Sequence, residues 1–250
     1  MTKLSVNVNK VALLRNSRQG STPSPVEAAR VALEAGAAGI TVHPRPDRRH
    51  IRPDDVDALA ALLAEPTWRE REFNIEGNPF EGDWVEMVRQ AKPDQCTLVP
   101  DTPEAFTSDH GWDVAANEAR LREMIATLQE TGARVSLFMD PEPAQIERVA
   151  ATGAERIELY TETYAAAYAA GGEVLEATFA RFAEAAKVAR DAGLGVNAGH
   201  DLNQANLGYF LRIPGIEEVS IGHALIAEAL VDGLAATVRA YLEVMERTRA

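Results

Sequence analysis

Eight short runs rich in β-branched residues alternate with longer stretches rich in alanine and leucine along this chain of 250 residues. Runs of this kind are typical of buried strands, and the longer stretches are typical of helices. Successive runs begin on average about 31 residues apart, the length of a strand–helix unit in a parallel sheet. We predict strands at residues 3–8, 39–43, 71–77, 95–100, 134–139, 156–161, 195–199 and 218–222.

Helix signals lie between the predicted strands. Ser24 and Pro25 favour a helix start, and Gly36 follows where that helix would end. Near the end of the chain we expect a short helix from His223 and then a last helix capped by Asp232.

This alternation predicts an α/β fold, a (β/α)8 TIM barrel that forms a single domain over residues 1–250 with extra short helices. A doubly wound open sheet is the alternative. Such sheets usually carry a glycine-rich phosphate-binding turn after the first strand, and neither GxGxxG nor GxxxxGK[ST] occurs here. The barrel is therefore favoured.

Charge and cysteine content exclude several classes of protein. With 25 basic and 38 acidic side chains the net charge is −13, which argues against nucleic acid or an anionic membrane as a partner. The single cysteine, Cys96, excludes an intrachain disulfide and a cysteine-rich zinc site, and it is expected to be a core residue. The sequence contains no apolar run of transmembrane or signal-peptide length, so we expect a cytoplasmic protein.

Polar residues alternate with apolar ones inside several predicted strands. Because helices cover the outside of a barrel, these polar columns are expected to face the barrel axis, where they need partners or a ligand. Barrel active sites open at the carboxyl ends of the strands, where the columns lie. The columns are Ser5, Asn7 and Asn9; Thr41, His43 and Arg45; and Asn74, Glu76 and Asn78.

Histidines mark the same end of the predicted barrel. His43, His200 and His223 lie at or just after the ends of strands, while His50 and His110 lie in the loops that follow strands two and four. Imidazole exchanges protons near neutral pH, so this grouping predicts acid–base catalysis. Zinc bound by three histidines and Glu76 is the competing interpretation, although no HxH or HExxH spacing pairs such ligands locally.

Two features indicate anion binding. The stretch 43–52 (HPRPDRRHIR) carries four arginines and one aspartate, and guanidinium groups suit phosphate oxygens. At residues 220–224 a strand ends in glycine and a helix begins, which leaves backbone N–H groups for a second phosphate. Arg15 and Arg18, expected in the loop after strand one, could serve either site. Two anion sites predict two small phosphorylated substrates or one bisphosphate.

Glu76 is the candidate general base because burial would raise its pKa. Pairing with Arg45 or a loop arginine is the structural alternative. Glu158 on strand six is a weaker candidate. Lys10, at the end of strand one, is a candidate Schiff-base lysine if it lies in a dry pocket.

Six segments together resemble the pyridoxine 5′-phosphate synthase family, in unbroken order from the first strand to the last helices. The combination of ITVHPRPDRRHI, VNAGH and IGHA is more specific than a general barrel pattern. The segments are VNVNKVALLRNSR (6–18), AGAAGITVHPRPDRRHI (35–51), TLVPD (97–101), RVSLFMD (134–140), GVNAGHDL (195–202) and VSIGHALI (219–226).

The resemblance implies a reaction and its residues. It implies condensation of 3-amino-2-oxopropyl phosphate with 1-deoxy-D-xylulose 5-phosphate to pyridoxine 5′-phosphate, inorganic phosphate and water, without a metal or organic cofactor, in a homo-octamer. The implied proton-transfer residues are His43, Glu76 and His200. The implied contacts are Asn7, Arg18, Gly222 and His223 for the aminoketone phosphate, and Arg45, His50 and Thr107 for the deoxyxylulose phosphate. Residues 106–111 would form a mobile loop that excludes water.

The chain departs from the family pattern at a few of these positions. Asn9 and Lys10 stand where many members have Asp-His, Tyr160 stands where many have histidine, and Asp201 replaces a glycine after His200. We keep Asn9, Lys10 and Asp201 as substrate-binding candidates. The remaining alternatives are a phosphosugar aldolase that uses Lys10 as its Schiff-base amine, and a non-catalytic barrel that binds phosphorylated metabolites.

Overall fold

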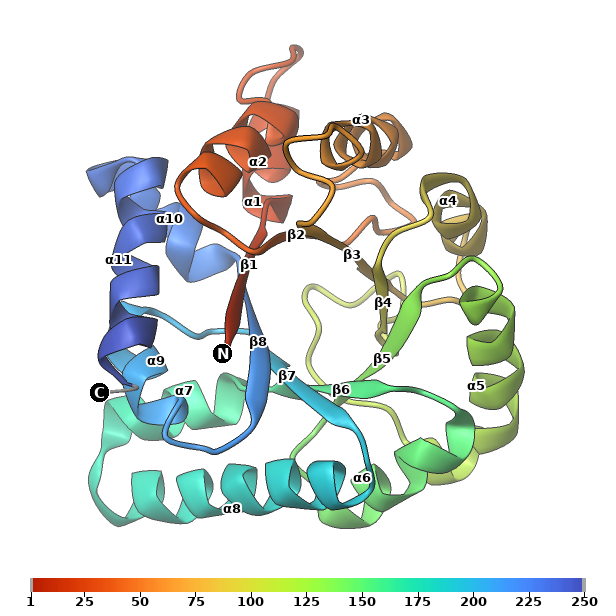
Figure 1. Cartoon of the computed structure of the whole chain (residues 1–250), viewed down its shortest axis with the longest axis vertical. Helices are drawn as coiled ribbons and strands as arrows, with labels where there is room; N and C mark the ends of the chain where they lie inside the picture. The colour runs from red at the N-terminus through yellow and green to blue at the C-terminus, as the bar shows by residue number, and fades with distance from the viewer. Residues whose placement is uncertain (1, 249–250) are drawn as a thin grey trace.

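The computed structural model describes residues 2–248 and shows a closed barrel of eight parallel strands in chain order, with helices around it (Figure 1). The predicted (β/α)8 barrel is confirmed, and all eight predicted strands are present with ends shifted by up to two residues. The strands are β1 Lys3–Asn7, β2 Gly39–Val42, β3 Glu72–Gly77, β4 Gln95–Leu98, β5 Arg134–Met139, β6 Arg156–Tyr160, β7 Gly195–Gly199 and β8 Ile216–Ile221.

Helices connect successive strands and cover the outside of the barrel. None of them, within residues 2–248, is long and apolar enough to cross a membrane. They are α1 Asn9–Asn16, α2 Pro25–Glu34, α3 Pro53–Leu63, α4 Trp84–Ala91, α5 Val114–Gln129, α6 Pro143–Val149, α7 Glu162–Ala170, α8 Gly172–Asp191, α9 Gln204–Phe210, α10 His223–Asp232 and α11 Leu234–Arg247, with a 3₁₀ turn at Ala150–Thr152.

The helix signals are confirmed at α2 and partly wrong near the end of the chain. The Ser24 side chain accepts a hydrogen bond from the backbone N–H of Glu27, as expected of an N-cap. Asp232, in contrast, is the last residue of α10, and Gly233 is the N-cap of α11. Gly233 has a φ of 81°, a left-handed conformation that glycine adopts readily, so the chain turns there rather than at Asp232.

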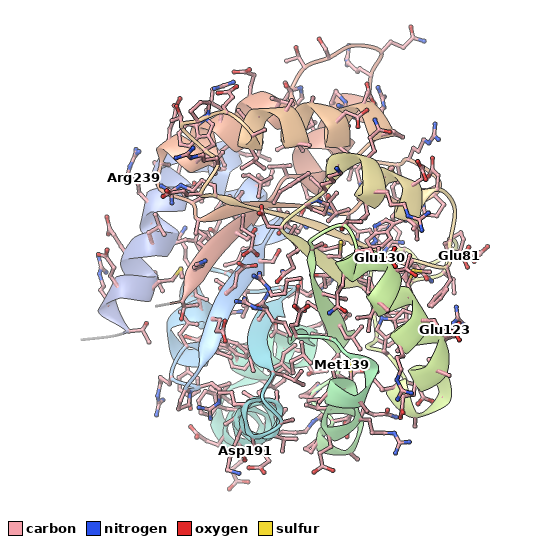
Figure 2. All side chains as sticks on the ribbon, turned by 45° about the vertical axis from the view of Figure 1, so that its right-hand side comes forward. Glu81, Glu123, Glu130, Met139, Asp191 and Arg239 are labelled. Carbon is pink, nitrogen blue, oxygen red and sulfur yellow. The ribbon has the colours of Figure 1, made fainter. Side chains whose placement is uncertain are left out.

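Apolar side chains fill the space between the barrel wall and the helices. Val6, Ile40 and Ile75 of the first three strands are fully buried, as are Leu59 of α3 and Leu121 of α5. Charged side chains such as Glu123 and Asp191 project outward from the helices (Figure 2). Burial of β-branched residues against the helices favours closure of the barrel, because it removes a continuous apolar surface from water.

Polar side chains from neighbouring strands pair inside the barrel. The hydroxyl groups of Ser5 and Thr41 lie 2.7 Å apart, and Thr97 donates to Asn74 over 3.1 Å. All four side chains are buried. The first residue of each predicted inward column therefore lies inside the barrel, and the hydrogen bonds offset the cost of taking these polar groups out of water. Asn9, in contrast, is the first residue of α1 and does not lie on a strand.

An ionic network closes the amino-terminal end of the barrel. Arg134 donates to Glu72 over 2.8 Å and to Gln95 over 2.7 Å. Burial and the neighbouring Glu72 raise the pKa of the Glu218 carboxyl well above its usual range. Protonation of Glu218 lets the two carboxyl groups lie close together at this end of the barrel.

Arg15 has a structural role, which corrects its predicted place in an anion-binding loop. The segment after β1 is helix α1, and the Arg15 guanidinium pairs through two hydrogen bonds with the buried carboxylate of Asp55 in α3. Arg15 also donates to the carbonyl of His50 over 3.3 Å. The pair therefore joins α1 to α3 and supports the turn that carries His50.

We expect Asp55→Ala to lower the free energy of unfolding by about 3 kcal/mol, because it leaves the Arg15 charge buried without a partner. Urea denaturation measures this change. The matched control is Asp54→Ala, which removes an exposed carboxylate from the same helix turn and should cost less than about 1 kcal/mol. Equal effects of the two substitutions would contradict a structural role for the pair.

Candidate active site

A cavity of about 590 Å³ opens at the carboxyl ends of the strands. This volume lies in the usual range for small-molecule sites. The structure brings together every predicted catalytic and substrate-binding residue except Arg18, which is exposed beyond the end of α1 and does not line the cavity. The predicted residues that line it are Asn7, Asn9, Lys10, His43, Arg45, His50, Glu76, Thr107, His200, Asp201, Gly222 and His223.

Four of the five histidines line this cavity, and His110 does not. The rings of His43 and His50 meet edge to face, with centroids 6.4 Å apart. His110 is exposed and pairs with the neighbouring Asp109. Within residues 2–248, no three histidine, cysteine, aspartate or glutamate side chains are arranged to hold a metal ion, which leaves the zinc interpretation without a ligand cluster.

Glu76 and His43 are two neighbouring titratable side chains of the cavity, and the fold removes both from most contact with solvent. Nδ1 of His43 lies 3.6 Å from Oε2 of Glu76, and less than an eighth of either side chain is exposed. Burial raises the pKa of Glu76 from 4.5 to about 8 and lowers the pKa of His43 from 6.5 to about 4. Near neutral pH the Glu76 carboxyl group therefore carries a proton, and the His43 imidazole is neutral.

The raised pKa of Glu76 agrees in direction with the expectation from the sequence, while the alternative pairing with Arg45 is absent. The Arg45 guanidinium pairs with Asp101 instead. With Arg45 engaged by Asp101, the positive charge around Glu76 does not offset the effect of burial on its pKa.

Glu158 lies beside this pair at the centre of the barrel. It is buried and lines the cavity, and its pKa is raised well above the usual range by burial and then by Glu76. Gly199 makes room for it, because a Cβ there would lie 2.2 Å from Oε1 of Glu158. Two adjacent buried carboxyl groups disfavour each other's ionisation, so the site holds protons that a substrate can accept.

Lys10, Arg45 and Arg49 supply positive charge to the lining of the cavity. Burial, followed by the charge of Arg45, lowers the pKa of the half-buried Lys10 amine. Both arginines donate to the carbonyl of Ala105, over 2.6 Å and 3.2 Å. Arg49 also donates to the carbonyl of Phe106 over 3.0 Å. These guanidinium groups thus hold the segment after β4 over the cavity.

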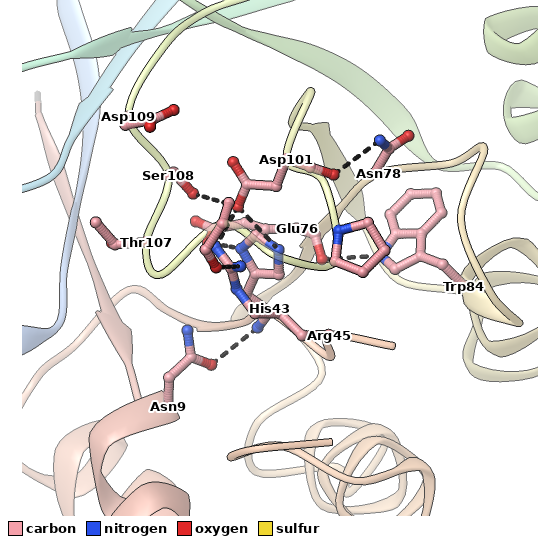
Figure 3. Close-up of polar contacts among 12 residues, drawn as sticks. Asn9, His43, Arg45, Glu76, Asn78, Trp84, Asp101, Thr107, Ser108 and Asp109 are labelled. Atoms are coloured by element: carbon pink, nitrogen blue, oxygen red, sulfur yellow. Dashed lines mark hydrogen bonds and ion pairs between the residues drawn. The ribbon is translucent and has the colours of Figure 1, made fainter. Parts of the chain in front are cut away.

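Asp101 is a residue that the sequence reasoning missed. Besides pairing with Arg45, it accepts a hydrogen bond from Ser108 over 2.7 Å and lies 3.8 Å from Nε2 of His43 (Figure 3). It directly follows the predicted fourth strand, the same position that identified the histidines on other strands. The position of Asp101 at the end of a strand was therefore the sequence signal that could have identified it as a site residue.

Asparagine side chains fix the backbone around His43. The side chain of Asn9 accepts a hydrogen bond from the backbone N–H of His43 over 2.9 Å (Figure 3). The backbone N–H of Asn9 donates to the side chain of Asn7 over 3.0 Å. Asn9 thus connects the start of α1 to the end of β2. Asn9 therefore orients His43, a candidate catalytic residue, and also lines the cavity.

The start of helix α10 forms another side of the cavity. Gly222, His223 and Ala224 line it, and no side chain caps this helix. Helix N-termini carry unpaired N–H groups and partial positive charge, which favour an anion. A Cβ on Gly222 would lie 3.1 Å from Asn7, so glycine lets the two strand ends approach closely.

His200 spans the cavity between two hydrogen-bonding partners. Its Nδ1 lies 2.7 Å from Oδ2 of Asp201, and its Nε2 lies 3.1 Å from the hydroxyl of Thr107. Tyr160 packs edge to face against the ring, with centroids 5.0 Å apart. The segment after β4 therefore touches a second catalytic candidate.

The fold and the cavity define a class: a parallel (β/α)8 barrel with a cavity at its carboxyl end that is lined by titratable side chains, by Lys10, Arg45 and Arg49, and by the uncapped start of a helix. Residues 4–247 match the family described as "Pyridoxal phosphate biosynthesis protein PdxJ". The chain belongs to this family.

Two similar relatives are both named pyridoxine 5′-phosphate synthase. The protein from Xanthomonas axonopodis pv. citri (strain 306) is 56% identical over 251 residues, which cover 98% of this chain and 96% of the relative. The protein from Albidiferax ferrireducens is 54% identical over 254 residues, which cover 100% and 99%.

Solved structures of more distant proteins share the barrel. A structure of KGPDC from Streptococcus mutans has a TM-score of 0.67 at 11% identity and covers the whole of both chains. Thiamine phosphate pyrophosphorylase from Pyrococcus furiosus has a TM-score of 0.64 at 14% identity over 99% of this chain and 97% of its own. At these identities the likeness shows the fold alone.

We expect Glu76→Gln to stabilise the protein increasingly as the pH rises. Because the pKa of Glu76 is about 8 in the folded protein and near 4.5 in the unfolded chain, the wild-type protein loses stability as the pH rises between these values. The variant lacks this loss. We compare the free energy of unfolding of the variant with that of the wild type at each pH. The advantage of the variant should be larger at pH 9 than at pH 5, by on the order of 2–4 kcal/mol.

Urea denaturation across this pH range measures the difference. Glu86→Gln, which changes an exposed glutamate on α4, should follow the wild-type profile and is the control. A Glu76→Gln profile parallel to that of the wild type would show that burial does not shift the carboxyl group.

Proposed function

We propose that this chain is a pyridoxine 5′-phosphate synthase, which condenses 3-amino-2-oxopropyl phosphate with 1-deoxy-D-xylulose 5-phosphate to form pyridoxine 5′-phosphate, inorganic phosphate and water. The observation that carries the proposal is the buried Glu76–His43 pair inside a cavity that also offers two places for anions. Membership of the PdxJ family and the names of its relatives support the same activity.

Two parts of the cavity suit the two phosphate groups. The start of α10, with Asn7, Gly222 and His223, is proposed to bind the aminoketone phosphate through backbone N–H groups. Arg45, His50 and Thr107 are proposed to bind the deoxyxylulose phosphate, with Lys10 nearby. The two organic ends would then meet near Glu76 and His43.

Arg18 fits this proposal least well, because it does not line the cavity of its own chain. Its role in binding the aminoketone phosphate is therefore a proposal that comes from the resemblance alone.

The protonation states suggest how the acid–base steps are divided. His43 is neutral near pH 7 and can accept the proton released when the amine adds to the ketone. Glu76 carries a proton below about pH 8 and can give it to a departing hydroxyl group before acting as a base. His200 is proposed as the acid for the later dehydration. Each step moves a proton between positioned groups, as ring closure and aromatisation require.

The experiment is to incubate chelator-treated protein with both phosphates and to measure pyridoxine 5′-phosphate by its fluorescence. Product should form only when both substrates are present. A chain that binds both compounds without forming product would be a phosphometabolite-binding barrel, and the proposal would be wrong.

The same mixture tests the aldolase alternative. Borohydride reduction should leave no substrate attached to Lys10, because the proposed reaction needs no Schiff base with the protein. An adduct on Lys10 would favour the aldolase.

We expect Glu76→Gln to lower kcat by about 10²–10⁴-fold, the usual loss when a general acid–base group is removed. Binding of each phosphate should change little, because glutamine keeps the shape of the side chain. Steady-state kinetics and titration calorimetry measure the two effects, again with Glu86→Gln as the control. Near-normal turnover in Glu76→Gln would contradict the proposed acid–base role of Glu76.

The proposal extends to assembly and location. A homo-octamer in the cytoplasm, with residues 1–250 as one catalytic domain, follows from the resemblance; residues 1, 249 and 250 lie outside the described residues. Light scattering of the purified protein should give about eight times the chain mass of 27.1 kDa. A monomer mass would remove this part of the proposal.

A further inference from the structure

The two residues after β7 have an uncommon backbone conformation. His200 has a φ of 83° and Asp201 a φ of 59°, both in the left-handed region that residues other than glycine seldom occupy. Such conformations cost free energy and occur where the surrounding structure holds them, often at functional sites. Here the turn places the carboxylate of Asp201 against the ring of the residue before it, with Oδ2 2.7 Å from Nδ1.

This contact determines which nitrogen of His200 faces substrate. A carboxylate only accepts hydrogen bonds, so Nδ1 must carry a hydrogen toward Asp201. The free electron pair of the neutral ring is then on Nε2, which lies 3.1 Å from the Thr107 hydroxyl at the cavity wall. The edge-to-face contact with Tyr160 restricts rotation of the ring.

We propose that Asp201 is a positioning residue whose carboxylate holds Nδ1 of His200 and so presents Nε2 as the atom that exchanges protons with substrate. The inference rests on the proposed function and deepens it. It assigns Asp201 a role through His200, in place of the direct substrate contact for which Asp201 was a candidate from the sequence.

The surroundings keep Asp201 ionised for this role. The hydrogen bond from His200 holds the pKa of Asp201 below its usual range, and the charges of His223 and Lys10 act in the same direction. Titratable groups from several elements interact electrostatically with His200 or Asp201: Lys10 of α1, His43 after β2, Glu76 of β3, Tyr160 of β6 and His223 of α10. The hydrogen bond from Nδ1 of His200 is accepted by Asp201 itself.

Kinetics of Asp201→Asn provide the first test. The substitution keeps the size of the side chain and removes its charge, so kcat should fall about 10–100-fold while both KM values stay within about twofold. The alkaline limb of the kcat profile should move to lower pH, because the protonated ring loses its carboxylate partner. Asp201→Glu restores the charge and should recover part of the loss.

Two further variants separate this role from general effects. Asp191→Asn removes the same charge from an exposed pair with Lys187 at the end of α8 and should leave all kinetic values unchanged. Asp201→Gly suits the left-handed backbone and should fold even if Asp201→Asn does not. The kcat of Asp201→Gly should fall at least as far as that of Asp201→Asn.

Histidine labelling tests the contact without relying on turnover. Diethyl pyrocarbonate modifies unprotonated imidazole, and peptide mass spectrometry follows each histidine separately. The pH midpoint of labelling at His200 should move to lower pH in Asp201→Asn, while that at the exposed His110 stays unchanged. The labelling result does not depend on turnover. Failure of the wild-type protein to form pyridoxine 5′-phosphate would count against the proposed function and not against the contact between Asp201 and His200.

Three outcomes would overturn the inference. One is unchanged kcat in both Asp201→Asn and Asp201→Gly. The second is a rise in one KM with normal kcat, which would make Asp201 a substrate contact. The third is an unchanged midpoint at His200.

Discussion

Removal of Glu76 from water by the closed barrel is the constraint on which the site depends. The Glu76 side chain is largely buried, Arg45 is engaged by Asp101, and the pKa of Glu76 rises to about 8. The same desolvation keeps His43 neutral, so a proton donor and a proton acceptor lie 3.6 Å apart near neutral pH. A more open sheet would hydrate both groups and return them to their ordinary, less useful states.

The segment between β4 and α5 connects this buried pair to the rest of the cavity. Arg45 and Arg49 donate to its carbonyl groups, Ser108 donates to Asp101, and Thr107 contacts His200. Arg45, which is proposed to bind a phosphate, therefore also holds the segment. A phosphate bound to the Arg45 guanidinium would compete with the carbonyl group of Ala105 for the same donor.

Much of the fold and of the site followed from the sequence, because both depend on local patterns. Strand–helix alternation fixed the barrel, and residues at the ends of strands, such as His43 and His200, had to meet at one rim. The structural role of Arg15 could not be predicted from the sequence. Its partner Asp55 lies 40 residues away, and pairing over that distance leaves no local sequence pattern. The network around Asp101 and the His200–Asp201 contact depend in the same way on side-chain geometry.

The central claim is that burial keeps a proton on Glu76 at neutral pH. Infrared difference spectra between the wild-type protein and Glu76→Gln test it directly, because a protonated carboxyl group has its own C=O absorption. We predict such a band at pH 7 that fades as the pH rises through about 8. A difference spectrum at pH 7 with only the bands of an ionised carboxylate would contradict the account.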